Sequence, residues 1–172
     1  MVHTKYKLTP QDAATYFFIE NFSHKREREI LLDLHEYHNQ MIVWDYRHEH
    51  LLFKQSVMNL LTLYELDDRT YNEAELILRE VDSTIEADTG ADYFGAYFKL
   101  IWLQLMYSGI SYRKIKLRTL LHDFGYKRRT EALTSSMIRA MNALGLVTYL
   151  RNYEVCDIRD VMLDDMVMIR LS

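Results

Sequence analysis

Residues 111–150 carry the pattern that most constrains the fold of this chain. Two stretches with apolar residues at helical spacing, 111–124 and 130–144, are each closed by a glycine, which is typical of helix C-termini. Ser111 is placed to cap the first of these helices. Residues 146–150 then have the β-branched and aromatic composition of a strand. The stretch predicts two short helices joined by a tight turn and followed by a strand.

The second predicted helix has an apolar side and a polar side. Its apolar residues recur at helical spacing from Leu133 to Leu144. Ser135, Arg139 and Asn142 fall on one opposite stripe, at spacings of four and three. Short polar and cationic side chains of this kind can approach a base edge or a phosphate without steric obstruction. The full polar set is Thr134, Ser135, Ser136, Arg139 and Asn142.

The same stretch is strongly basic. Residues 111–151 hold nine basic and two acidic residues, a net charge of +7 in a chain whose net charge is −4. A basic cluster on a helix-turn-helix pattern is the electrostatic footprint expected of a phosphate-binding protein. The alternative is an ordinary solvated face that happens to be basic. The basic residues that we expect to contact phosphates are Arg113, Lys127, Arg128 and Arg129.

The run SSMIRAMNALGLV places a polar-faced helix directly before a Gly-Leu-Val strand start, and with it segment 111–171 resembles the winged helix-turn-helix superfamily. The resemblance implies that the helix at 130–144 enters the major groove of duplex DNA. Ser135, Arg139 and Asn142 would then face bases, while Ser136 joins the basic turn in holding phosphates. Residues 146–150 and 166–171 would form a β-hairpin wing. The wing region carries a net charge of −3, which departs from the usual basic wing.

The N-terminal half predicts helices. Thr9 and Pro10 mark the start of one, and Ser23 is the cap of the next. From there a heptad-like apolar seam runs toward Leu66 without Gly or Pro. We expect two helices with a junction in 39–46; one long helix, or a short strand over 41–44, are the alternatives. The seam is either a dimer surface or intrachain packing.

Further along, a capping box at 70–73 predicts a helix to about residue 85. Residues 65–92 carry a net charge of −8, read either as a solvated helix face or as an acidic surface that orients the basic module. A linker at 88–90 precedes an apolar helix over 92–107. Residues 1–8 are expected to be a loose arm.

Composition supports a helical protein. Five glycines and one proline among 172 residues disfavour a turn-rich β fold, and 49% hydrophobic residues suffice for a core. The expected fold is mainly α: a helical bundle followed by a winged helix-turn-helix with a small β-hairpin wing. We divide the chain into a helical region at 1–90, a possible dimerisation region, and a winged-helix domain at 91–172.

Catalytic and metal-binding patterns are absent from the sequence. There is no P-loop, no G-x-S-x-G and no C-x-x-C pair, so we expect neither an enzyme nor a cofactor. His35, His38, His48 and His50 are near one another, but their spacing suits packed or surface histidines better than a metal site. The lone Cys156 and the lack of a secretory pattern favour a reducing, cytoplasmic setting without a membrane partner.

The function expected from the sequence is sequence-specific binding of duplex DNA, as a homodimer, in the control of transcription or replication. The alternative is a protein-interaction module, an adaptor in which the winged helix docks a protein rather than DNA. The overall acidity and the acidic wing favour that alternative.

Overall fold

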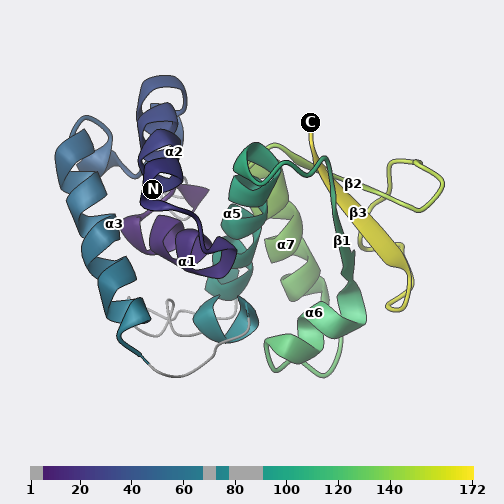
Figure 1. Ribbon diagram of the computed structural model, residues 1–172. Coiled ribbons are helices and arrows are strands. Elements are labelled where there is room, and N and C mark those ends of the chain that lie inside the picture. Colours follow the sequence, from purple (N-terminus) through teal and green to yellow (C-terminus); the bar gives the residue numbers. More distant parts are fainter. Residues whose placement is uncertain (1–5, 68–72, 78–90) are drawn as a thin grey trace.

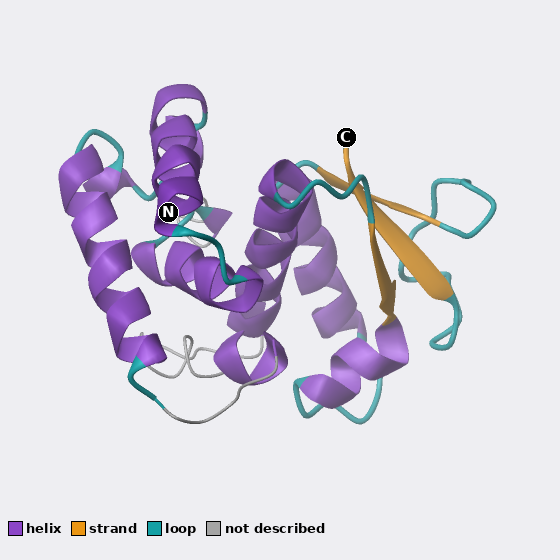
Figure 2. Cartoon of the chain, in the orientation of Figure 1, coloured by secondary structure: helices purple, strands orange, loops and turns teal. Residues whose placement is uncertain are grey.

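The computed structural model describes residues 6–67, 73–77 and 91–172. They form a mainly helical chain with a small three-stranded antiparallel sheet at the C-terminal end. Figure 2 shows the strands gathered at the side of the molecule opposite the N-terminal helices. The prediction of a mainly α chain that ends in a small antiparallel sheet is confirmed at this level.

Polar side chains set the starts of the first two helices, as the sequence predicts. The Thr9 hydroxyl accepts a hydrogen bond from the N–H of Asp12 at 3.3 Å, and the Asp12 carboxylate accepts one from the N–H of Thr9 at 2.8 Å. This capping box opens α1 (Pro10–Glu20). Ser23 caps α2 (His24–Tyr37) with its side chain.

The apolar seam is divided between two helices. After α2, two 3₁₀ turns, η2 (Asn39–Met41) and η3 (Trp44–Tyr46), lead to α3 (His50–Glu65). The expected junction in 39–46 is confirmed, and neither the single long helix nor the strand over 41–44 forms.

The helix breaks here because the N-terminal arm pairs with the junction. The N–H of Leu8 donates to the carbonyl of Met41 at 2.6 Å, and the N–H of Val43 donates to the carbonyl of Leu8 at 3.0 Å. Leu8 is fully buried. The prediction of a loose arm is therefore wrong at Leu8, whereas residues 1–5 lie outside the described residues.

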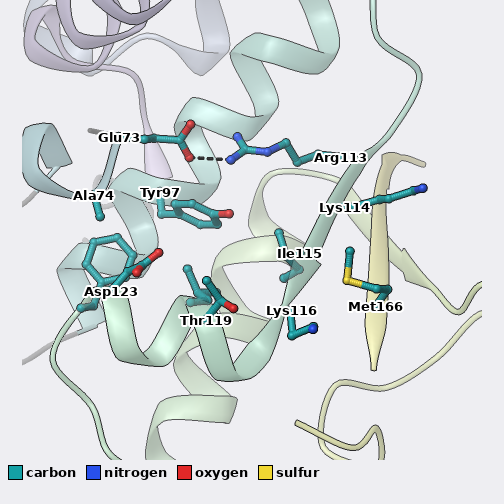
Figure 3. Close-up of a pocket in the computed structure, with 12 residues that line it drawn as sticks. Glu73, Ala74, Tyr97, Arg113, Lys114, Ile115, Lys116, Thr119, Asp123 and Met166 are labelled. Carbon is teal, nitrogen blue, oxygen red and sulfur yellow. Dashed lines mark hydrogen bonds and ion pairs between the residues drawn. The ribbon is translucent and has the colours of Figure 1, made fainter. Parts of the chain in front are cut away.

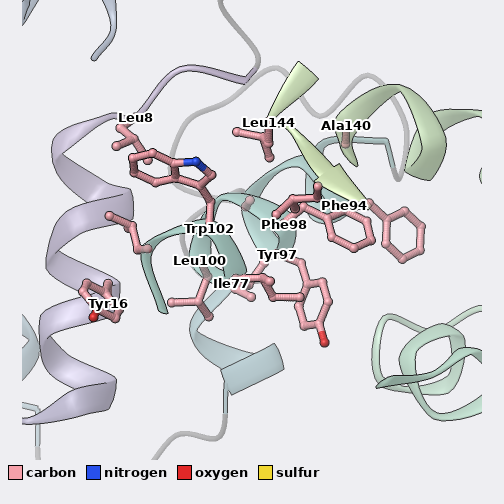
Figure 4. Close-up of a cluster of buried hydrophobic side chains, with 14 of the residues drawn as sticks. Leu8, Tyr16, Ile77, Phe94, Tyr97, Phe98, Leu100, Trp102, Ala140 and Leu144 are labelled. Atoms are coloured by element: carbon pink, nitrogen blue, oxygen red, sulfur yellow. The ribbon is translucent and has the colours of Figure 1, made fainter. Parts of the chain in front are cut away.

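Helix α5 (Ala91–Tyr107), predicted with nearly these bounds, is the centre of the core. Its residues 94–105 are all buried, as an all-round apolar helix requires. Figure 4 shows Tyr16 of α1 near one side of this helix and Leu144 near another, so one hydrophobic cluster joins the two halves of the chain. None of the described helices is both long and apolar enough to cross a membrane.

The first helix predicted in the C-terminal half is wrong over its first six residues. Residues 113–116 instead form strand β1 (Arg113–Lys116), and helix α6 (Leu117–Asp123) begins only after it. Ile115 and Leu117 are both buried but lie two residues apart, which is the period of a strand. Ser111 is exposed and caps no helix.

The remaining elements match the prediction closely. Helix α7 (Glu131–Ala143) is followed by strands β2 (Leu146–Tyr149) and β3 (Met166–Leu171). The sheet has the order β1-β3-β2, and both pairings are antiparallel. Figure 1 shows α7 and this sheet on one side of α5 and the N-terminal helices on the other.

The acidic segment falls largely on residues that are not described. Residues 73–77 are helical and Ile77 is fully buried, in line with the predicted helix. The capping box, the rest of that helix and the linker at 88–90 lie at 68–72 and 78–90, outside the described residues. The two interpretations of the acidic face therefore stay predictions.

Two histidines meet where α2 approaches α3. The rings of His35 and His50 lie 4.9 Å apart between centroids, and the Nδ1 atom of each is buried without a hydrogen-bond partner among the described residues. Burial lowers the pKa of His50 below its ordinary 6.5; His35 and Lys54 act in the same direction, and Glu36 opposes them. The folded chain therefore disfavours a proton at this site.

We expect this site to make stability depend on pH. Below pH 6.5 the unfolded chain takes up a proton at His50 that the folded chain resists, so the free energy of unfolding falls as pH drops through that value. Thermal unfolding between about pH 7.5 and pH 5 should show a smaller loss of Tm for His50→Gln than for the wild type. An equal loss of Tm for the two proteins between these pH values would contradict this expectation.

Candidate nucleic-acid interface

One face of α7 is open to solvent and polar. Thr130 caps the helix by accepting a hydrogen bond from the N–H of Leu133 at 3.2 Å, and Gly145 ends it with a φ of +65°. Met137 and Met141 are buried against the core, whereas Arg139 and Asn142 are exposed and Ser135 and Ser136 are partly exposed. The predicted stripe of Ser135, Arg139 and Asn142 therefore lies on the solvent side of the helix.

Thr134 is the one member of the predicted polar set that points inward. It is buried, and its hydroxyl donates to the carbonyl of Thr130 at 2.9 Å. Ser136 makes the same kind of bond to the carbonyl of Ala132 at 3.0 Å, and a guanidinium nitrogen of Arg139 donates to the Ser136 hydroxyl at 3.3 Å. Arg139 and Ser136 thus form one exposed polar pair on α7.

The basic residues of the turn between α6 and α7 have two different roles. Lys127 and Arg128 are exposed, so their charges reach solvent next to the start of α7. Arg129 turns inward, where its Nη1 donates to the carbonyls of Ile158 at 2.9 Å and Val161 at 2.6 Å. Arg129 therefore holds residues 158–161, which follow β2 in the chain, next to the start of α7.

Arg113 also lies away from the exposed face of α7. Its guanidinium forms an ion pair with Glu73 at 2.6 Å, and it donates to the side-chain oxygen of Gln104. Figure 3 shows this pair at the edge of a cavity of about 500 Å³ that Tyr97 also lines. Burial raises the pKa of the Tyr97 hydroxyl, so this side chain stays neutral beside the ion pair.

A groove runs between α7 and the chain that returns after β2. It has a volume of about 450 Å³, and Asn142 lines it together with Ile138, Val155 and Arg159. Arg159 is exposed and lies 3.4 Å from the Asp157 carboxylate. Sequence reasoning missed Arg159, because residues 155–161 show no clear period that would place it beside α7.

The described residues offer little for redox or metal chemistry. No group of three or more His, Cys, Asp or Glu side chains among them is arranged to hold a metal ion. Cys156 is partly buried, and burial raises the pKa of its thiol above the ordinary value. A thiol of that kind is a poor nucleophile near neutral pH.

Comparisons with protein-family models, with curated proteins and with solved structures found no match to this chain.

Proposed function

We propose that residues 91–172 form a winged helix-turn-helix module that binds duplex DNA through the exposed face of α7. The observation that carries the proposal is the solvent-facing stripe of Ser135, Arg139 and Asn142, with Lys127 and Arg128 at the start of the same helix. The order α6, α7, β2, β3 supports it, because the resemblance implies two helices followed by an antiparallel hairpin; strand β1 is an addition to that expectation.

The proposed contacts separate into two kinds. Asn142 and Arg139 reach base edges in the major groove, where an amide matches adenine and a guanidinium matches guanine. Lys127, Arg128 and the newly recognised Arg159 hold phosphates on the flanking backbone. Arg113 and Arg129, which the sequence also suggested as phosphate ligands, are left out because both make internal contacts.

We further propose that the protein acts as a homodimer in cytoplasmic control of transcription or replication. Support for the dimer is the set of large apolar side chains that remain exposed on the N-terminal helices. Tyr37, Trp44 and Leu51 of the predicted seam are 70%, 67% and 78% exposed, so most of their surface is left in solvent by the single chain. A monomer by sedimentation at micromolar concentrations would contradict the dimer.

The rival function is protein docking by the same module. In that case an acidic protein surface, rather than DNA, would meet Lys127, Arg128 and Arg139. The acidic residues near the wing support the rival, although Asp164 is already bound to Arg118 at 2.7 Å. The two functions differ in their response to a nucleic-acid probe.

Duplex binding is expected to be steeply dependent on salt. With the three phosphate contacts of Lys127, Arg128 and Arg159, the slope of log affinity against log salt is about −3, and Lys127→Ala/Arg128→Ala should reduce its magnitude by about 2. The measurement is fluorescence anisotropy of a labelled random duplex of about 30 base pairs, titrated from low to physiological salt.

Lys25→Ala/Arg28→Ala is the matched control, since it removes the same charge from exposed positions on α2. An equal decrease in slope for the control variant would show that the effect comes from net charge alone and not from the position of Lys127 and Arg128. Absence of duplex binding by the wild type at low salt would overturn the DNA proposal and leave the docking module.

A further inference from the structure

The outer face of the sheet is built from residues that alternate with the core-facing ones. Ile115, Val167 and Ile169 are buried on the inner face, against the helices. Their neighbours therefore share the outer face, and the register places Lys114, Met168 and Tyr149 in one row across all three strands. Figure 1 shows no helix over this face among the described elements; on it Lys114 is exposed, whereas Met168 at the centre of the row is buried.

Three tyrosines surround one arginine on this face: Tyr112 precedes β1, Tyr149 ends β2 and Tyr153 follows in the next turn. The guanidinium carbon of Arg170 lies 5.5 Å from the ring centroid of Tyr112, 5.7 Å from that of Tyr149 and 5.2 Å from that of Tyr153. Each distance is within the range of a cation–π contact. The Nε of Arg170 is buried and has no hydrogen-bond partner among the described residues.

The turn after β2 holds Tyr153 in place. The N–H of Tyr153 donates to the carbonyl of Leu150 at 2.9 Å, and the N–H of Leu150 donates to the carbonyl of Glu154 at 2.9 Å. Tyr153 has a φ of +67°, a strained value for an aromatic residue, yet its side chain is 67% exposed. An aromatic side chain kept in solvent at a conformational cost suggests a binding role.

The charged side chains on the outer face are positive; Lys114 is exposed, and Lys116 and Arg170 are partly exposed. Lys114 lies 5.8 Å from the ring of Tyr112, and Lys116 follows two residues along the same strand. Among the described residues no carboxylate forms an ion pair with Lys114, Lys116 or Arg170, whereas the nearby Asp164 is bound by Arg118.

We propose that this outer face, the tyrosine platform of Tyr112, Tyr149, Tyr153 and Arg170, binds single-stranded nucleic acid. Unpaired bases stack on tyrosine rings whose other face meets Arg170, while Lys114 and Lys116 neutralise the phosphates. Paired bases are stacked inside a duplex, so they cannot offer their faces to the rings. The platform lies on the opposite face of the sheet from the helices, so its binding is independent of the duplex contacts proposed for α7.

The test compares a variant that loses two tyrosine rings of the platform with a variant that keeps them. The probes are labelled oligo(dT) and oligo(U) of about 20 nucleotides, measured by anisotropy at about 50 mM salt. Tyr149→Ala/Tyr153→Ala is expected to weaken binding by about tenfold or more, because each stacked base contributes at least a few-fold. Tyr149→Phe/Tyr153→Phe keeps both rings and should bind within about threefold of the wild type. The relative affinity for the two probes separates DNA from RNA.

Two controls keep the outcome decisive. Met162→Ala removes an exposed large side chain outside the platform and should leave binding unchanged. If the double variant has a much lower Tm than the wild type, Tyr153→Ala alone replaces it, because Tyr153 lies at a solvent-exposed turn position. Failure of both probes to bind, or unchanged binding after loss of the Tyr153 ring, overturns the proposal. Lys127→Ala/Arg128→Ala should weaken duplex binding and spare the single-stranded probes, so the two proposals fail separately.

Discussion

Replacing Lys99 by methionine is expected to lower the free energy of unfolding by about 3–5 kcal/mol. Lys99 of α5 lies 2.7 Å from the Asp12 carboxylate, and both side chains are buried. The substitution leaves the carboxylate buried without its ammonium partner, and a buried charge that loses its counter-ion is costly. Urea or guanidinium denaturation followed by circular dichroism measures the effect.

Two further variants separate the charge from the packing. Asp12→Asn/Lys99→Met removes both charges and should recover part of the loss, since the double variant buries no uncompensated charge. Lys25→Met changes an exposed lysine of α2 and should shift the unfolding free energy by less than about 0.5 kcal/mol. A Lys99→Met protein as stable as this control would show that the ion pair does not hold α1 to α5.

Arg129→Ala should destabilise the protein by about 2–3 kcal/mol, although the sequence suggested a ligand-binding role for this residue. Its Nη1 donates to the carbonyls of both Ile158 and Val161, and charged hydrogen bonds are stronger than neutral ones. Hydrogen exchange at residues 157–165 should accelerate more than exchange in α3, because the lost bonds fasten this segment.

Arg128→Ala is the matched control for that prediction. Arg128 is the preceding residue and is exposed, so its removal should change the unfolding free energy by less than about 0.5 kcal/mol. The pair also separates stability from binding: Arg128 is expected to matter for DNA and Arg129 for the fold. Equal stability of the two variants would contradict the structural role of Arg129.

Local signals in the sequence predicted most of the helices because the capping chemistry acts over three or four residues. Thr9, Ser23 and Thr130 each begin a helix as expected, and Gly145 ends α7. The start of the first C-terminal helix was missed because the spacing of two between Ile115 and Leu117 was read as part of a helical pattern.

The candidate sites were harder to predict because charge alone does not reveal a distant partner. Arg113 was grouped with the basic turn, but Glu73, forty residues earlier in the chain, takes its guanidinium. The tyrosine platform was missed for the same reason: Tyr112, Tyr149 and Arg170 become neighbours only through the pairing of three strands. In contrast, the stripe on α7 was predicted with its spacing, because it lies within one helix.

The most direct test of the account is a titration of the isotope-labelled protein with a short DNA duplex, followed by amide chemical shifts. The proposed interface predicts that the largest shift changes fall in residues 127–142 and near Arg159, with little change in α3. Shift changes concentrated in α3, or none at low salt, would contradict duplex binding by the exposed face of α7.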